Sequence, residues 1–236
     1  MNRVFIGWDA RESEAADVLR YSINAHASKP VETTFIKLDD CIQRGYHPAL
    51  IMENCVKHEE RPGTTDFTYT RFLVPWLCGY EGLALFMDCD MLVVGDINEV
   101  FDLPMDGLAL RCTQHDFTSQ SAHKMWGETQ VNYPRKLWSS FMLLDCAKLY
   151  CWALGNVACW GGQRLHRFED IPDEQIGAIP LDWNEVEHWS PRTRCYHWTE
   201  GGPWLTQYAN HQYADRWNEW RDRNREHVNR ASRDPA

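Results

Sequence analysis

Short apolar runs along the chain alternate with segments of helical spacing. Strands are predicted at 3–8 (RVFIGW), which is followed directly by Asp9, and at 31–38 (VETTFIKL). Between them, apolar residues of 13–27 recur every three or four positions, and Ser13 is suited to an N-cap, so this segment is expected to be a helix. Strand, helix and strand within about forty residues predict a βαβ unit with a parallel sheet.

The strongest apolar run is 83–94 (LALFMDCDMLVV). It is apolar on both faces, as expected for a central strand of an α/β sheet. The same reasoning predicts further strands at 107–113, 138–146 and 178–186, the last at a sheet edge, and helices at 66–80, 147–160 and 207–229. Segments 41–64 and 114–136 lack periodicity and are expected to be loops, the second of them a lid. No repeat or linker interrupts the pattern, which indicates one domain with a C-terminal helical appendage.

Composition and charge narrow the possible functions. The 236 residues suit a single domain with a sizeable core. The formal net charge of -10 argues against a general binder of phosphate backbones, so a nucleic-acid acceptor is disfavoured. An acidic protein that handles a polyanionic substrate is expected to place a divalent cation between itself and that substrate. The 12 tryptophans suit either sugar-stacking surfaces or a rigid core.

Cysteine usage and the N-terminal sequence bear on location. The nine cysteines are odd in number and form no CxxC pair, so all are expected to be reduced thiols. The start of the chain, MNRVFIGWDARE, reaches charged residues too early for a signal peptide. No apolar run approaches the length of a membrane span. A cytoplasmic protein is therefore expected.

Two carboxylates follow the strongest strand. Asp88 and Asp90 share one face of an extended chain, where they repel each other unless a cation lies between them. Mg²⁺ and Mn²⁺ prefer such oxygen ligands and often share them with substrate phosphates. The alternative is a strand end whose carboxylates are solvated or cap turns. Asp9, at the end of the first strand, either lines a ligand site or caps a helix.

Other nucleotide-binding motifs are absent from the sequence. The first strand is followed by GWDARE, which lacks GxGxxG, and no GxxxxGK[ST] occurs. Dinucleotide binding on a glycine-rich turn and P-loop chemistry are therefore both disfavoured.

An ordered series of motifs resembles the family-8 glycosyltransferases and their relatives with the GT-A fold. YTRFLVPWL, with Arg71, precedes LALFMDCDMLVVGDINEVF, which carries a DxD metal motif and a following Asp-Ile. Later come SSFMLLDC, IPLDWNEV and HWTEGGPW, in the family's order. The resemblance covers most of 3–205. It implies a Rossmann-like GT-A catalytic domain over 1–206, with a mixed, mostly parallel sheet flanked by helices. The C-terminal helix and tail, 207–236, are expected to belong to the same domain.

The resemblance also implies a set of site residues. Asp88, Asp90 and His197 would hold Mn²⁺ or Mg²⁺, and Asp88 would also approach the sugar or ribose of a nucleotide-sugar donor. Arg71 would lie near the donor's sugar and phosphates. Further donor-binding positions are Trp8, Asp9, Cys89, Gly201 and Gly202. The alternatives are that His197 is a structural histidine before a Gly-Gly turn and that Arg71 is a surface charge on a helix.

Two departures from the family pattern affect the site. Gly202 stands where the family has a phosphate-contacting lysine, so the replacement cation is expected among Arg192, Arg194 and Lys124. The family's Asp-Gln pair near the acceptor is matched loosely by PDEQ. Asp173 and Gln175, together with Arg71, are the expected catalytic residues.

The predicted activity is metal-dependent transfer of a hexose from a nucleotide-diphosphate sugar, with a UDP-sugar as the expected donor, to an acceptor hydroxyl. The resemblance implies retention of anomeric configuration and leaves the acceptor open among glycans, lipid-linked glycans and other hydroxyl compounds. Two alternatives stay open: a nucleotidyltransferase, disfavoured because GWDARE offers a single arginine, and a non-catalytic sugar- or nucleotide-binding protein of the same fold. The presence together of Asp88, Asp90 and His197 argues against the second.

Overall fold

A six-stranded mixed sheet forms the centre of the molecule. The computed structural model describes residues 1–47, 65–116, 134–186 and 188–233. The strand order is β2-β1-β3-β6-β5-β7. In this sheet β6 runs antiparallel to its neighbours and the other strands are parallel to one another. The strands are β1 (Asn2–Gly7), β2 (Val31–Ile36), β3 (Leu83–Met87), β5 (Leu110–Thr113), β6 (Phe141–Asp145) and β7 (Ile176–Ile179). The predicted mixed, mostly parallel sheet is confirmed, with β7 at an edge.

A second, two-stranded sheet corrects the prediction of one long strand at 83–94. The chain leaves the main sheet after Met87, and β4 (Met91–Val93) pairs antiparallel with β8 (Cys195–His197). β4 is buried, and its Leu92 belongs to a second apolar cluster away from the main core. The apolar character of 91–93 therefore reflects burial on both faces, with Met91 and Val93 in the main core and Leu92 in the second cluster, rather than a continued central strand. β8 has no counterpart among the predicted strands.

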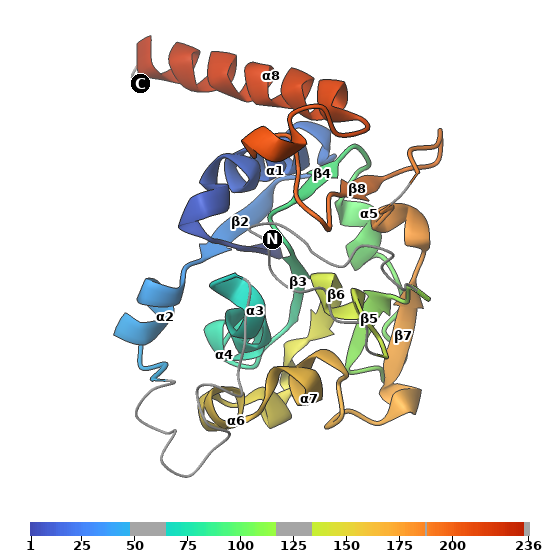
Figure 1. The fold of residues 1–236 in the computed structure, drawn as a ribbon. Coiled ribbons are helices and arrows are strands. Elements are labelled where there is room, and N and C mark those ends of the chain that lie inside the picture. Colours follow the sequence, from blue (N-terminus) through green and yellow to red (C-terminus); the bar gives the residue numbers. More distant parts are fainter. Residues whose placement is uncertain (48–64, 117–133, 187, 234–236) are drawn as a thin grey trace.

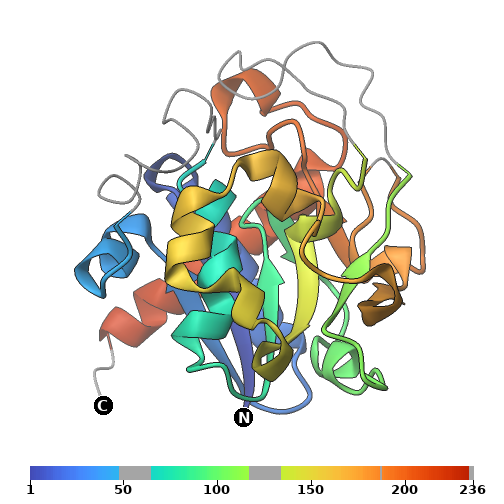
Figure 2. The same ribbon diagram turned by 90° about the horizontal axis from the view of Figure 1, so that it is seen from below.

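Helices cover both faces of the main sheet. In Figure 1, α1 (Ser13–His26) and α8 (Ala214–Arg233) lie on one side, and a group of shorter helices lies on the other. Figure 2, seen from below, shows that group in front of the strands. The group consists of α3 (Phe67–Thr70), α4 (Val74–Leu77), α6 (Leu154–Cys159) and α7 (Gly162–His166). Two further short helices are α2 (Leu38–Gln43) and α5 (Asn98–Phe101).

Local sequence explains where the predicted helices break. The helix expected at 66–80 consists of α3, a 3₁₀ turn at Arg71–Leu73 and α4, which begins beside Pro75. Proline is tolerated in the first turn of a helix because its missing N–H has no partner there. The segment expected to be a helix at 147–160 forms 3₁₀ turns before α6. The short helices α2, α5 and α7 have no counterpart among the predicted helices.

Several tryptophans build the second apolar cluster. Trp217 of α8 is 1% exposed and packs with Val18 of α1 and Leu92 of β4. The ring centroids of Trp217 and Trp204 lie 5.5 Å apart. Trp198 belongs to the same cluster and directly follows β8. These tryptophans serve as core, and they attach the C-terminal helix to the strands of the small sheet.

The state of the cysteines differs in one place from the expectation. Cys159 is disulfide-bonded, so the prediction that every cysteine is a reduced thiol is wrong at this position. Seven other cysteines of the described segments are free. None of the helices in these segments has the length and apolar character needed to cross a membrane. The cytoplasmic location stays a prediction.

The packing of α8 predicts a stability effect. Trp217→Ala should lower the free energy of unfolding by about 3–5 kcal/mol, because it leaves a cavity among the buried rings. Urea denaturation followed by circular dichroism measures the change. The exposed Glu219→Ala on the same helix should stay within about 0.5 kcal/mol of wild type. An equal, small effect of both changes would mean that α8 is not part of the core.

Candidate metal centre

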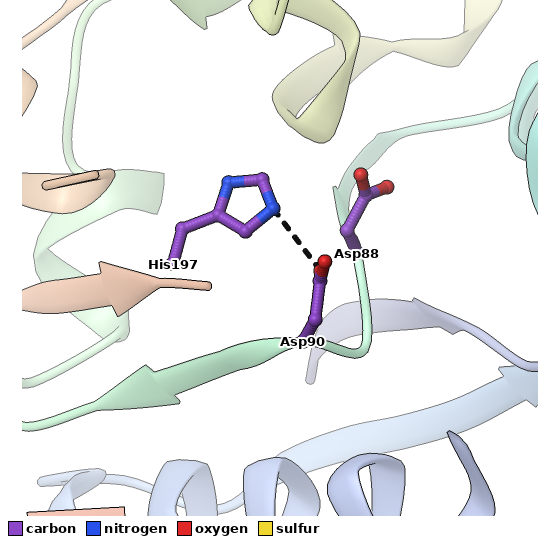
Figure 3. A group of neighbouring side chains, drawn as sticks. All are labelled: Asp88, Asp90 and His197. Atoms are coloured by element: carbon purple, nitrogen blue, oxygen red, sulfur yellow. Dashed lines mark ion pairs between the residues drawn. The ribbon is translucent and has the colours of Figure 1, made fainter. Parts of the chain in front are cut away.

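Backbone pairing brings Asp88, Asp90 and His197 together. Asp88 follows β3, and its N–H donates to Ser140 O at 2.9 Å. Met91 of β4 is in register with His197 of β8, and Trp198 N–H donates to Asp90 O at 2.9 Å. One ligand atom from each of Asp88, Asp90 and His197 lies within 4.8 Å of the others. Figure 3 shows the imidazole and the two carboxylates converging from the small sheet and the turn after β3.

One oxygen of each carboxylate in this group has an ionic neighbour but no well-aligned hydrogen-bond donor. Within the described segments, Oδ1 of Asp88 and Oδ1 of Asp90 are buried and accept no hydrogen bond. Their close neighbours are ionic: Arg71 Nη1 lies 2.8 Å from Asp88 Oδ1, and His197 Nε2 lies 3.1 Å from Asp90 Oδ1. A buried carboxylate oxygen without donors is costly unless a cation satisfies it.

Asn184 determines which nitrogen of His197 faces the carboxylates. Its Nδ2 donates to Thr113 Oγ1 at 2.8 Å and to Ser140 Oγ at 2.9 Å. Both amide protons are thereby used, so Oδ1 accepts from His197 Nδ1, 2.9 Å away. A neutral His197 then presents the lone pair of Nε2 to Asp90. Two acceptor atoms at 3.1 Å need a proton or a metal ion between them, so the donor set fits a divalent cation.

The electrostatics of the group respond to burial and to its neighbours. Burial raises the pKa of Asp88 to about 6, with Asp90 adding to the rise and Arg71 opposing it. Burial alone would lower the pKa of His197, but the charges of Asp90 and Asp88 outweigh it and raise that pKa. The rise for Asp88 reflects mainly burial, whereas the rise for His197 reflects the negative charge of the two carboxylates; a bound cation would oppose both.

Arg71 lies inside the site rather than on a helix surface. It is 6% exposed and forms the ion pair with Asp88. Its Nη1 donates to Ser139 O at 3.0 Å, and its Nε donates to Phe67 O at 3.2 Å. These hydrogen bonds hold a permanent positive charge at the carboxyl end of β3. The structure thus brings Arg71 together with the candidate metal ligands, and its expected place beside a donor's sugar and phosphates stays a prediction.

Trp8 and Asp9 follow the carboxyl end of β1. This is the same end of the sheet as the carboxyl end of β3, where Asp88 lies. Asp9 caps the following 3₁₀ turn: it accepts from Arg11 N at 2.9 Å and from Asp66 N at 3.2 Å. Burial would raise its pKa, but the hydrogen bonds from Arg11 and Asp66 lower it. Lys37 Nζ lies 4.7 Å from the ring centroid of Trp8. The capping alternative for Asp9 is thus present, and a donor-binding role stays a prediction.

Cys89 has Glu12 as its hydrogen-bond partner. Its Sγ donates to Glu12 Oε2 at 3.6 Å, and burial raises the pKa of the thiol. Glu12 is 1% exposed, and burial together with Asp90 and Asp9 raises its pKa to about 8. Burial and the nearby negative charges thus favour the neutral form of Glu12. Sequence reasoning missed Glu12, whose one signal was an acidic residue in the turn after the first strand.

The Gly201–Gly202 segment explains the missing lysine. Gly201 has φ +117°, and a Cβ at Gly202 would lie 2.0 Å from the ring of Trp204. A lysine at 202 would require Trp204 to move. Of the proposed replacement cations, Arg194 pairs with Glu99, Arg192 is exposed, and Lys124 lies outside the described residues. Among the arginines and lysines that the structure describes, Arg71 is the one paired with a carboxylate of the group.

Asp173 and Gln175 lie at the end of the sheet where β5 and β7 begin, opposite to the end that carries Asp88. Gln175 O accepts from Ala109 N at 2.9 Å, at the amino ends of β5 and β7. These strands are parallel to β3, whose carboxyl end carries Asp88. The side chain of Asp173 is 81% exposed and pairs with Arg135 at 2.6 Å. Within the described residues, no hydrogen bond or ion pair joins either side chain to the metal group, and their catalytic role stays a prediction.

Comparison with known proteins identifies a relative by sequence and several solved structures of similar fold. Protein CDI of Arabidopsis thaliana is 38% identical over 240 residues, which cover 97% of this chain and 90% of that protein. No protein-family model matches the chain.

Solved structures with a similar fold are glycosyltransferases. They include the bifunctional glycosyltransferase WbbM (TM-score 0.60, 15% identity), GlyE of Streptococcus pneumoniae TIGR4 (0.58, 14%) and the galactosyltransferase LgtC in complex with donor and acceptor sugar analogues (0.56, 14%). Each match covers 93% of this chain. The chain spans 49% of the WbbM chain, 60% of GlyE and 95% of LgtC. At these identities the likeness establishes a glycosyltransferase GT-A-type fold.

The role of Asn184 can be tested through metal affinity. Asn184→Ala should weaken Mn²⁺ binding about 10- to 100-fold, because His197 loses the acceptor that holds its ring and tautomer. Isothermal titration of the purified protein with MnCl₂ measures the affinity. Asn156→Ala, on α6, removes a comparable hydrogen bond to Cys151 O and should leave it unchanged. Identical affinities for the Asn184 variant and wild type would contradict the role.

The buried Glu12 predicts a pH dependence of stability. Its pKa is raised on folding, so stability is complete below the unfolded-state pKa of about 4.5 and falls as pH rises towards 8. Glu12→Gln should therefore be more stable than wild type at pH 8 in metal-free protein, and this advantage should shrink as pH approaches 5. Each pH unit contributes at most about 1.4 kcal/mol. Thermal melts across this range, with the exposed Glu174→Gln as the matched control, provide the measurement; a pH-independent difference for Glu12→Gln would contradict the burial argument.

Proposed function

The chain belongs to the family of Protein CDI of Arabidopsis thaliana, and we propose that it is a metal-dependent glycosyltransferase that moves a hexose from a UDP-sugar to a hydroxyl group. The observation that carries the proposal is the buried group of Asp88, Asp90 and His197. It lies at the carboxyl ends of the strands, where open α/β sheets bind their ligands. The glycosyltransferase fold of the chain makes a nucleotide-sugar the fitting ligand class.

The metal ligands have separate tasks in this proposal. Asp90 and His197 face each other across 3.1 Å, and Asp88 lies on the side of Arg71. Bound Mn²⁺ or Mg²⁺ would neutralise charge that develops on the leaving diphosphate. Asn184 keeps the Nε2 lone pair of His197 directed at the metal position. Arg71 supplies a second, fixed positive charge, which stabilises negative charge in a site of low dielectric.

The nucleotide and diphosphate fit the surfaces next to this group. Trp8, at the end of β1, offers an aromatic face for the base, and Asp9 is anchored beside it by Arg11 and Asp66. Gly201 and Gly202 come four and five residues after His197, and their contact with the diphosphate is part of the proposal. The metal ion and Arg71 would then supply the positive charge that the family's lysine provides in this segment.

Retention of configuration and a divalent-metal requirement are parts of the proposal that rest on the resemblance to family-8 enzymes. Asp173 and Gln175 keep their assignment near the acceptor as a prediction only, because their position at the amino ends of the strands lends it no support. The acceptor class is a hydroxyl compound without further definition.

A donor screen tests the activity and the metal requirement together. Wild-type protein incubated with a panel of nucleotide-sugars and Mn²⁺ should release nucleoside diphosphate by slow hydrolysis, and chelation with EDTA should stop the release. Asp90→Ala should lower this rate at least about 1,000-fold, because the metal loses a direct ligand. The exposed Asp102→Asn should keep the wild-type rate and the same melting temperature.

Two results would count against the proposal. Nucleotide-sugar binding without Mn²⁺ and without any release of nucleoside diphosphate would indicate a non-catalytic binding protein. Turnover of Asp90→Ala close to wild type would remove the metal assignment.

A further inference from the structure

His115 carries a polar atom without a partner beside the metal centre. It lies two residues after the end of β5, at the same end of the sheet as Asp88. Its Nε2 is buried, and no hydrogen-bond partner reaches it from the described residues. A buried ring nitrogen left unpaired at a candidate site indicates a position for a ligand group.

The state of the ring determines what kind of group fits. The other ring nitrogen is left for the hydrogen bond between His115 and the backbone of Asn184, and Trp138 Nε1 donates to His115 O at 3.0 Å. Burial and the charge of His197 lower the pKa of His115 to about 4, against the effect of the Asn184 hydrogen bond. With its proton on Nδ1, the neutral ring offers Nε2 as an acceptor. A hydroxyl group can donate to it, whereas an ionised phosphate cannot.

The order of strands places His115 on the sugar side of the metal. Trp8 and Asp9 follow β1, the metal group follows β3, and His115 follows β5, which is separated from β3 by β6. A nucleotide over β1 with its diphosphate at the metal directs the attached hexose away from β1. In this arrangement the hexose lies towards the amino end of β6 and the carboxyl end of β5, where Nε2 of His115 is unpaired.

We propose that His115 binds a hydroxyl group of the transferred hexose by accepting its hydrogen bond at Nε2, and so contributes to the choice of donor sugar. This assignment rests on the proposed function of the chain as a glycosyltransferase. The contact is made to the sugar and to neither the metal nor the nucleotide, which separates its effects from those of Asp90 and His197.

Comparing UDP with UDP-hexoses isolates this contact. Isothermal titration with Mn²⁺ present would use UDP and whichever of a panel of UDP-hexoses binds tightest. His115→Leu should weaken binding of the UDP-hexose about 3- to 10-fold, the loss expected for one hydrogen bond, and change binding of UDP less than about 2-fold. His115→Gln, which retains an acceptor oxygen, should recover most of the affinity. His211→Leu, at a partly exposed histidine, is the matched control.

Deoxy analogues identify the hydroxyl. Wild type should bind the UDP-hexose that lacks the contacted hydroxyl about 3- to 10-fold more weakly than the parent sugar. His115→Leu should bind the analogue and the parent equally, since the partner of that hydroxyl is gone. Circular dichroism melts of each variant show that the comparison is made between folded proteins.

Each other outcome overturns the assignment. An equal loss of affinity for UDP and UDP-hexose would assign His115 to the metal or nucleotide, and unchanged affinities would exclude a contact. A loss seen only in transfer to an acceptor, with donor binding intact, would move His115 to the acceptor. Failure of wild type to bind UDP or any UDP-hexose with Mn²⁺ is a different result, because it overturns the proposed function and the assignment with it.

Discussion

The pairing of β4 with β8 is the interaction on which the candidate site depends. β4 follows the two aspartates directly, and β8 ends in His197, more than a hundred residues later in the chain. With Met91 in register with His197, the imidazole is held beside Asp90, and the backbone hydrogen bond from Trp198 to Asp90 O locks that position. A slip of one residue would turn the imidazole to the opposite face of the small sheet.

The site concentrates charge in a place where burial makes charge costly. Asp88, Asp90 and Glu12 are all buried, and the raised pKa values of Asp88 and Glu12 express the cost. Arg71 and His197 compensate in part. Such an arrangement disfavours stability, and its persistence fits a group that is completed by a bound cation. Asn184 is part of the same arrangement. It is held by Thr113 and Ser140, and it fixes the orientation of the His197 ring.

The aromatic cluster connects this site to the C-terminal helix. Trp198 directly follows His197, and Trp204 ends the glycine-containing segment that begins there. Both rings pack in the cluster that Trp217 of α8 completes. The helix therefore supports the rear of the segment that includes Gly201 and Gly202. This packing gives α8 a structural reason to be part of the domain, whichever acceptor the protein uses.

Local patterns were enough to predict much of the fold and half of the site. The apolar runs of β1 and β3, the spacing of α1 and the Asp88–Asp90 pair depend on neighbours in sequence, so the chain alone determined them. The resemblance to family motifs added His197 and Arg71. Glu12, Asn184 and His115 were missed because their roles arise from burial and from partners far away in the chain. Asp173 and Gln175 were placed near the acceptor by a short motif, yet the register of β7 puts them at the opposite end of the sheet from Asp88. Residue type and local period thus specified the strands and the carboxylates, whereas the tertiary structure alone decided which side chains meet, because strand pairing joins segments that local sequence leaves independent.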